Sequence, residues 1–313
     1  MTDSVVVREV GMRDGLQSIG SLMSTDDKKE WIERSVAAGL REMEVCSFVP
    51  EKYLPQFKDA AEVASYAGGR AGLVGVALVP NLRGARRALE SGIDKIVCIT
   101  SATESFSRAN LRRSKADSLA EINEIVALRD QVAASGRRVL IQVGISVCFG
   151  CPFEGSVDDD AVCSAAQASA AAGADEIGLA DTAGYGEPQQ VGRIFRRLAS
   201  ELPHVPLAAH FHDTRGLGLA NVTAAVEAGV RRFDASLGGL GGCPFAPGAT
   251  GNIDSEDCAF LLESMGFDTG IDIDALIVLR QKVETWLPDE KFYGMVAKAG
   301  LPKHYRPASA LAA

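Results

Sequence analysis

Residues 171–182 read Ala-Ala-Gly-Ala-Asp-Glu-Ile-Gly-Leu-Ala-Asp-Thr and contain the unit from which the fold is built. A helical segment ends in small residues, Gly173 follows, an apolar run extends from Glu176 to Ala180, and Asp181 stands where that run stops. Glycine just past a helix is the expected residue for a left-handed C-terminal cap. The stretch therefore predicts a helix, a tight turn and a strand with a carboxylate at its end.

The same punctuation recurs along the chain. Further helical segments end in small residues followed by a glycine at 37–40, 90–93, 134–137 and 228–230. The strands expected from this pattern are residues 5–10, 42–47, 73–79, 95–100, 139–147, 176–180, 207–211 and 232–236. Many of them are nearly continuous apolar runs, which is typical of parallel strands covered on both faces.

Eight strand–helix units within about 260 residues predict an α/β fold, the TIM (β/α)8 barrel. A doubly wound open sheet is the rival fold, but no Gly-x-Gly-x-x-Gly turn follows the first strand. No linker rich in Pro or Ser divides the sequence. We therefore expect a catalytic barrel domain over residues 1–272 and a short C-terminal helical extension over residues 273–313, packed on the barrel.

The composition limits the class of protein. Hydrophobic residues make up 47% of the chain, and no apolar run approaches the roughly 20 residues that span a bilayer. The net charge of −9 argues against a nucleic-acid partner, which favours a basic face. Seven cysteines without a paired framework, and no export signal after Met1, predict a cytoplasmic protein with reduced thiols.

A barrel collects its chemistry at the C-terminal ends of its strands. Charged residues and a thiol do follow the expected strands. They are Arg13 and Asp14 after the first strand, Glu44 in the second, Asp181 after the sixth, His210 and His212 at the end of the seventh, and Cys243 in a glycine-rich loop after the eighth. Each has a simpler alternative, because Asp14 or Asp181 could cap a helix and Cys243 could be a small buried apolar residue.

Two of the four histidines, His210 and His212, stand two residues apart at the end of a strand-like run. On a strand, side chains two residues apart share a face. Two imidazoles on one face can occupy adjacent positions on a single metal ion, and a hydrogen-bonded surface pair is the alternative.

Glu44 lies inside an apolar strand, Met43-Glu44-Val45. An unpaired carboxylate is costly in such a place, so Glu44 needs a partner. Arg13, at the end of the neighbouring strand, is the expected one.

Six motifs in this order resemble those of the 3-hydroxy-3-methylglutaryl-CoA lyases, which belong to a group of metal-dependent lyases and synthases built on a TIM barrel. The resemblance extends from Val10 to about Pro302. The glycine-rich loop that ends in Gly-Asn, and the lack of a long regulatory or biotin-carrying C-terminal domain, are similar to the lyase branch in particular. The motifs occupy residues 10–17, 44–49, 148–155, 178–182, 210–214 and 239–252.

The resemblance implies a divalent cation, Mg²⁺ or Mn²⁺, held by Asp14, His210, His212 and Asn252. Oxygen and imidazole ligands with open positions suit these ions. It also implies the cleavage of a 3-hydroxyacyl-CoA thioester, 3-hydroxy-3-methylglutaryl-CoA, to acetyl-CoA and acetoacetate by a retro-Claisen reaction. A homodimer is a further implication.

The same resemblance implies roles for the other site residues. Arg13 would face the developing enolate oxygen, Cys243 would take part in proton transfer, and Asp181 is the candidate acid–base partner. Glu44 would orient Arg13, and His210 counts as catalytic as well as metal-binding. Cys148 and Cys151 match a run that the family carries on the loop after the fifth strand, so a redox role is not expected.

The CoA portion should cross the barrel mouth toward basic residues in the loop after the fourth strand. Arg108, Arg112 and Arg113 are the expected phosphate partners there, and a solvated surface run is their alternative. Gln17 and Asn110 complete the expected substrate-binding set.

Several alternatives remain open at this point. Arg215 stands where the family has a Tyr, and an extra arginine near the acyl pocket favours a substrate with a differently placed carboxylate. Citramalyl-CoA, which would give acetyl-CoA and pyruvate, is the leading one. A condensing enzyme that runs related chemistry forward, and a metal-binding barrel without turnover, are the other candidates.

Overall fold

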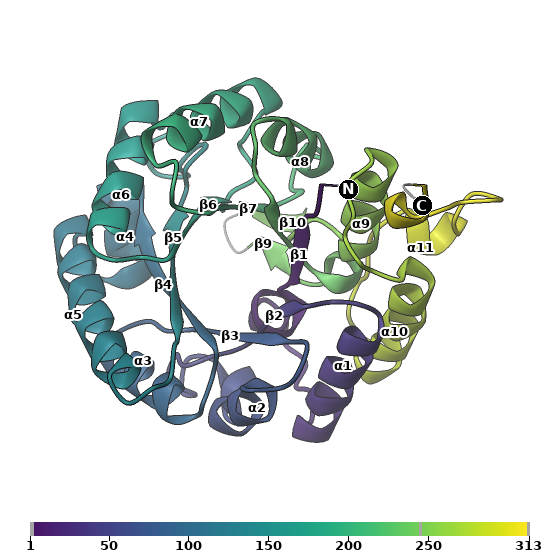
Figure 1. Cartoon of the computed structure of the whole chain (residues 1–313), viewed down its shortest axis with the longest axis horizontal. Helices are drawn as coiled ribbons and strands as arrows, with labels where there is room; N and C mark the ends of the chain where they lie inside the picture. Colours follow the sequence, from purple (N-terminus) through teal and green to yellow (C-terminus); the bar gives the residue numbers. More distant parts are fainter. Residues whose placement is uncertain (1–2, 244–245, 312–313) are drawn as a thin grey trace.

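Eight parallel strands close into a barrel in the computed structural model, with helices around the outside (Figure 1). The structure describes residues 3–243 and 246–311, apart from the side chains of residues 243–249 and 311. The barrel closes where β8 pairs with β1, with Val6 opposite Arg232 and Glu9 opposite Ala235. The strands are β1 Val6–Glu9, β2 Glu42–Ser47, β3 Val74–Leu78, β4 Lys95–Ser101, β5 Leu140–Ser146, β6 Glu176–Asp181, β7 Leu207–Phe211 and β8 Arg232–Ala235. The predicted TIM barrel is confirmed, and each strand begins and ends within two residues of its expected bounds.

Helices connect the strands on the outer face of the barrel (Figure 1). The five glycines expected after helices all have φ between 89° and 99°, which confirms them as left-handed caps. The helices are α1 Thr25–Ala37, α2 Ala60–Ala67, α3 Leu82–Glu90, α4 Glu104–Leu111, α5 Lys115–Ala133, α6 Asp159–Ala171, α7 Pro188–Glu201, α8 Gly218–Glu227, α9 Ser255–Ser264, α10 Ile273–Trp286, α11 Val296–Ala299 and α12 Ala308–Leu311. Shorter turns are η1 Gly11–Gly15, η2 Pro55–Phe57 and η3 Leu237–Gly239.

Two features of the described chain have no counterpart in the sequence prediction. The loop after β8 forms a two-stranded antiparallel ribbon, β9 Gly242–Cys243 and β10 Ala246–Thr250. Residues 104–111, which we expected in a loop, form helix α4 instead. The N-cap position Thr103 is followed by Glu104 in the first turn, where a negative charge stabilises a helix.

The C-terminal helices pack on the barrel. Helix α10 contacts α1 and α9, and it buries Leu276, Leu279 and Val283 in the same apolar core that surrounds the strands. The division into residues 1–272 and 273–313 stays a prediction, because this core is continuous across it. Among the described residues, no helix has the length and apolar character needed to cross a membrane.

The interior of the barrel near the strand starts is filled with ion pairs. Lys95 donates to Glu42 and Glu176, at 2.8 Å in each case. Arg8 contacts the same two carboxylates and, at 2.6 Å, that of Asp234. Burial would raise the pKa of Glu42, but the charges of Arg8 and Lys95 outweigh it and lower that pKa. Glu42 therefore stays charged although its side chain is buried.

Replacing Lys95 by Met should destabilise the fold severely. The side chain of Lys95 is 1% exposed, so its removal leaves two buried carboxylates without this cation. Breaking a buried ion pair in this way costs about 3–5 kcal/mol of unfolding free energy. Denaturant unfolding of Lys95→Met, with Lys29→Met as the control at a more exposed pair with Glu62, measures the difference. The control should lose far less unfolding free energy, because exposed ion pairs contribute little, and equal losses in the two variants would contradict this account.

Candidate metal centre and active site

The turn after β1 places Arg13 and Asp14 at the mouth of the barrel. The amides of both residues donate to the carbonyl oxygen of Val10, at 3.0 and 2.7 Å, and so close one wide helical turn, η1. The guanidinium of Arg13 contacts Glu44 Oε2 at 2.7 Å with Nη2 and Asp14 Oδ1 at 2.5 Å with Nη1. The expected pairing of Glu44 with Arg13 is confirmed. Burial raises the pKa of Glu44, and the charge of Arg13 opposes that rise.

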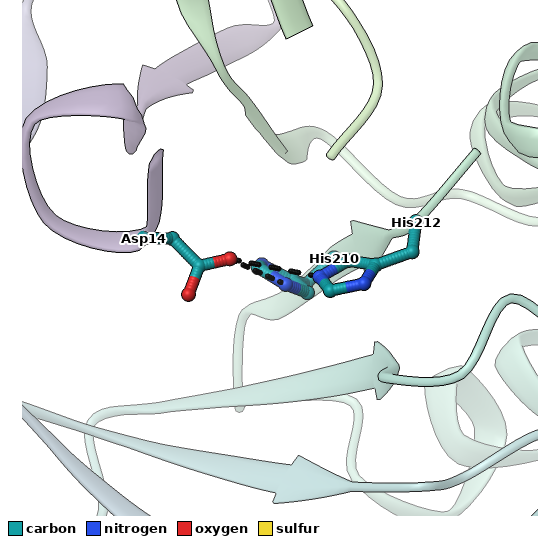
Figure 2. Close-up of side chains that lie close together, drawn as sticks. All are labelled: Asp14, His210 and His212. Carbon is teal, nitrogen blue, oxygen red and sulfur yellow. Dashed lines mark ion pairs between the residues drawn. The ribbon is translucent and has the colours of Figure 1, made fainter. Parts of the chain in front are cut away.

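His210 and His212 share a face at the end of β7, as predicted, and their ring centroids lie 5.2 Å apart. Figure 2 shows both imidazoles directed toward the carboxylate of Asp14. The Nε2 atoms of His210 and His212 lie 3.7 and 3.6 Å from Asp14 Oδ2. In the described part of the chain, these three residues form a group whose ligand atoms all lie within 4.8 Å of one another.

The fourth predicted ligand, Asn252, lies beside this group. Its backbone pairs with that of His212, and its side-chain Nδ2 donates to Asp14 Oδ2 at 2.5 Å. Its Oδ1 is buried and has no hydrogen-bond partner among the described residues. A half turn of the amide exchanges nitrogen and oxygen, and would direct Oδ1 toward the group. Two oxygens and two imidazole nitrogens fit Mg²⁺ or Mn²⁺, whose adjacent ligands stand about 3 Å apart.

Nearby charges keep the carboxylate of Asp14 ionised, which is the form that can bind a cation. Burial would raise the pKa of Asp14, but the charge of Arg13 and the neighbouring histidines outweigh it and hold that pKa well below its ordinary value. The carboxylate therefore remains ionised at neutral pH.

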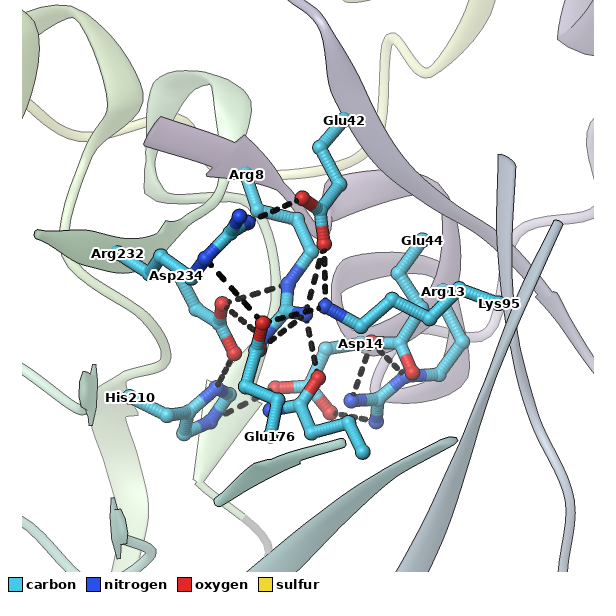
Figure 3. Close-up of polar contacts among 11 residues, drawn as sticks. Arg8, Arg13, Asp14, Glu42, Glu44, Lys95, Glu176, His210, Arg232 and Asp234 are labelled. Carbon is cyan, nitrogen blue, oxygen red and sulfur yellow. Dashed lines mark hydrogen bonds and ion pairs between the residues drawn. The ribbon is translucent and has the colours of Figure 1, made fainter. Parts of the chain in front are cut away.

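Asp234, at the end of β8, fixes the orientation of His210. Its Oδ2 lies 3.0 Å from His210 Nδ1, and its Oδ1 contacts Arg8 in the barrel interior (Figure 3). Burial would raise the pKa of Asp234, but the charge of Arg8 and the bond with His210 lower it to about 2. When the imidazole is neutral, an ionised acceptor at Nδ1 holds the ring proton there and leaves Nε2 free to act as a metal ligand.

Asp181 lies at the end of β6, but it does not cap a helix. Its two carboxylate oxygens accept hydrogen bonds from the amides of Tyr185 and Gly186, at 2.8 and 3.0 Å. Helix α7 is capped by Glu187 instead. Asp14 is no helix cap either, because it lies within η1. Burial raises the pKa of Asp181, and the two amides oppose the rise.

The cysteines divide into two groups. The side chain of Cys243 lies outside the described part of the chain, so its role stays a prediction. Six other cysteines are buried free thiols. Cys148 donates to the carbonyl oxygen of Ile145, while Cys151 contacts the hydroxyl of Thr103, so these two thiols have separate partners.

The residues expected to bind CoA differ in their contacts and in their exposure to solvent. Arg113 contacts Glu121 and donates to the carbonyl oxygen of Pro80 at 2.9 Å. Arg108 forms an exposed ion pair with Glu104 within α4. Asn110 and Arg112 are exposed, and Gln17 is half-buried.

Arg215 is turned toward the loop after β6. Its Nη1 donates to the carbonyl oxygens of Ala183 and Gly184, at 3.0 and 2.9 Å, and its guanidinium lies over the ring of Tyr185. These contacts tie the loop after β7 to the loop after β6. Arg215 therefore has a structural role, whether or not it also contacts the acyl group of a substrate.

The sequence analysis did not identify the buried charged residues whose contacts hold the site residues in place. Arg8, Glu9 and Asp234 carry no motif of their own. The available signal was their position, because each is a charged residue within a strand of the barrel, where a charged side chain needs a partner.

This chain is similar to a known family and to several known proteins. A family model described as HMGL-like matches residues 4–283. The chain is 40% identical, over 88% of its length and 90% of the relative's, to the 3-hydroxy-3-isohexenylglutaryl-CoA/hydroxy-methylglutaryl-CoA lyase of Pseudomonas aeruginosa. It is 36% identical, over 95% of both chains, to the (R)-citramalyl-CoA lyase of Chloroflexus aurantiacus. An HMG-CoA lyase of Acinetobacter baumannii, solved with coenzyme A and 3-methylmalate, superposes with a TM-score of 0.88 at 41% identity and covers 97% of this chain and 98% of its own.

Replacing Asp234 by Asn should weaken metal binding. The amide can present its nitrogen to His210 and stabilise the wrong ring tautomer, and loss of such a partner typically costs 10–100-fold in metal affinity. Calorimetric titration of the folded variant with Mn²⁺ measures the change. Asp175→Asn, which alters a carboxylate paired with Arg129, is the control and should bind Mn²⁺ like the wild type. Unchanged affinity in Asp234→Asn would contradict the orienting role.

Proposed function

Because the chain belongs to the HMGL-like family, we propose that it cleaves 3-hydroxy-3-methylglutaryl-CoA to acetyl-CoA and acetoacetate. It is a carbon–carbon lyase, as are its curated relatives. The observation that carries the proposal is the convergence of Asp14, His210 and His212 beside the Arg13–Glu44 pair at one end of the barrel.

We propose that Asp14, His210, His212 and Asn252 hold the Mg²⁺ or Mn²⁺ of the reaction. The buried, unpartnered Oδ1 of Asn252 and the ionised Asp14 support this ligand set. When bound, a divalent cation acidifies the substrate's hydroxyl group and orients the bond to be broken.

The reaction moves a proton and one electron pair. A base removes the proton of the C3 hydroxyl, the C2–C3 bond breaks, and its electrons pass onto the thioester as an enolate. Acetoacetate leaves, and an acid returns a proton to C2 to give acetyl-CoA. Arg13 is fixed by Glu44, so its guanidinium meets the negative charge on the enolate oxygen without having to reorganise.

We propose that Asp181 carries the proton, together with His210 at the metal centre and Cys243 in the loop after β8. The raised pKa of Asp181 supports a group that holds a proton closer to neutral pH than an ordinary carboxyl. The glycine-rich backbone of residues 238–243 supports the place of Cys243, because such a loop can approach a bound substrate closely.

For the CoA portion we propose contacts with Arg108, Asn110 and Arg112, and with Gln17 at the inner edge of the mouth. The exposure of Arg108, Asn110 and Arg112 supports phosphate binding there. Arg113 fits a structural role better, since its guanidinium already binds Glu121 and a backbone carbonyl.

Citramalyl-CoA is the second candidate substrate. The relative of that activity is 36% identical to this chain over 95% of its length. Three relatives at 37–40% identity are hydroxymethylglutaryl-CoA lyases, and they favour the first substrate.

We also propose that the enzyme works in the cytoplasm as a homodimer. The cytoplasmic location is supported by the six described thiols, none of which forms a disulfide. The dimer is an inference from the family resemblance.

Acetyl-CoA release with Mn²⁺ tests the function, with 3-hydroxy-3-methylglutaryl-CoA and citramalyl-CoA compared side by side. The first substrate should be preferred, and Arg13→Met should lower kcat by about 10²–10³-fold because a fixed donor to the enolate is lost. Arg193→Met, at an exposed pair with Asp159, is the control and should retain full activity. Preference for citramalyl-CoA would transfer the assignment to that lyase, and cleavage of neither substrate would reject the proposal.

A further inference from the structure

Glu9 is a buried carboxylate that binds three separate segments of the barrel mouth. It is the last residue of β1, it is 0% exposed, and it lies on the face of the strand opposite Arg8. Its Oε1 accepts hydrogen bonds from the amides of Gly11 and Leu237, at 2.6 and 3.0 Å. Its Oε2 accepts one from the hydroxyl of Ser255 at 2.7 Å.

Each of these segments leads to a residue of the proposed active site. Gly11 begins the turn that presents Arg13 and Asp14. Leu237 begins the glycine-rich loop that runs to residue 243. Ser255 begins helix α9, three residues after Asn252. One side chain therefore joins the starts of all three.

The segments around Glu9 are packed closely against one another. A Cβ atom on Gly11 would lie 2.5 Å from Glu9 Oε1, so only glycine allows this approach. A Cβ atom on Gly15 would lie 2.9 Å from the carbonyl oxygen of Leu240, so the turn and the loop touch through their backbones. A shift of one segment must move the other.

The contacts of Glu9 depend on hydrogen bonding more than on charge. Burial raises the pKa of Glu9 to about 7, against the effect of the Ser255 hydroxyl and the amides of Leu237 and Gly11. The main effects that oppose this rise are hydrogen bonds and not the charge of a cation. An uncharged side chain of the same shape that accepts hydrogen bonds should therefore maintain the contacts of Glu9.

We infer that Glu9 is a positioning residue, which holds the Arg13–Asp14 turn, the glycine-rich loop and the start of α9 in one arrangement at the metal centre. Its kinetic consequence rests on the proposed lyase function. Its consequence for cation binding does not depend on that function.

Replacing Glu9 by Ala tests this role. The variant should lose about 100-fold in kcat with a much smaller change in KM, because misplaced catalytic groups cost about this much. Its Mn²⁺ affinity should fall by about tenfold or more. Glu9→Gln keeps an acceptor for both amides and a group that can bond Ser255, so it should restore kcat and Mn²⁺ affinity to within about tenfold of the wild type.

Glu263 provides a matched control. It is 4% exposed and accepts hydrogen bonds from the Thr269 amide, the Thr269 hydroxyl and the Ala308 amide, away from the barrel mouth. Glu263→Ala should lower the unfolding temperature and leave kcat unchanged. If Glu263→Ala lost as much kcat as Glu9→Ala, the loss in Glu9→Ala would be explained by general destabilisation of the fold. That result would overturn the inference.

Two other results would also overturn it. One is a folded Glu9→Ala protein with wild-type kcat and Mn²⁺ affinity, and the other is a Glu9→Gln protein as impaired as Glu9→Ala. If Glu9→Ala does not fold, Ser255→Ala replaces it, because that variant removes one of the three hydrogen bonds to Glu9. Its kcat and Mn²⁺ affinity then test the positioning role. If the wild type cleaves no 3-hydroxy-3-methylglutaryl-CoA, the proposed function fails, and the Mn²⁺ titrations still decide the role of Glu9.

Discussion

The carboxylate of Asp234 is shared between two groups, and the metal centre depends on this sharing. One oxygen contacts Arg8 at 2.6 Å, and the other lies 3.0 Å from His210 Nδ1. Through Arg8, the orientation of a candidate metal ligand is tied to the ion pairs that fill the barrel interior (Figure 3). Buried ion pairs of this kind contribute little net stability, but they hold each member in one geometry. The interior of this barrel thus supports the site directly above it.

A barrel with a polar interior also explains how its mouth is assembled. Arg13 and Asp14 come from the chain after β1, His210 and His212 from β7, and residues 237–255 from the connection after β8. Because β8 pairs with β1, the first and last of these segments are neighbours although they are far apart in sequence. Closure of the barrel, more than any local motif, brings the candidate ligands together.

The amino-acid sequence predicted most of the fold, since repeated glycine caps and apolar runs are local signals. It also predicted the pairing of Glu44 with Arg13 and the shared face of the two histidines, because both follow from strand geometry. The helix at residues 104–111 was missed, and so were the roles of Glu9 and Asp234. Their partners, Ser255 and Arg8, are 246 and 226 residues away, so no local pattern could reveal them.

The central claim is that both imidazoles bind the same cation. Pulsed electron paramagnetic resonance of the Mn²⁺-loaded protein, with histidine labelled by ¹⁵N, measures it most directly. The account predicts hyperfine coupling to two histidine nitrogens in the wild type, and to one when His212 is replaced by Ala. A spectrum without histidine coupling in the wild-type protein would contradict the claim, because the cation would then bind elsewhere.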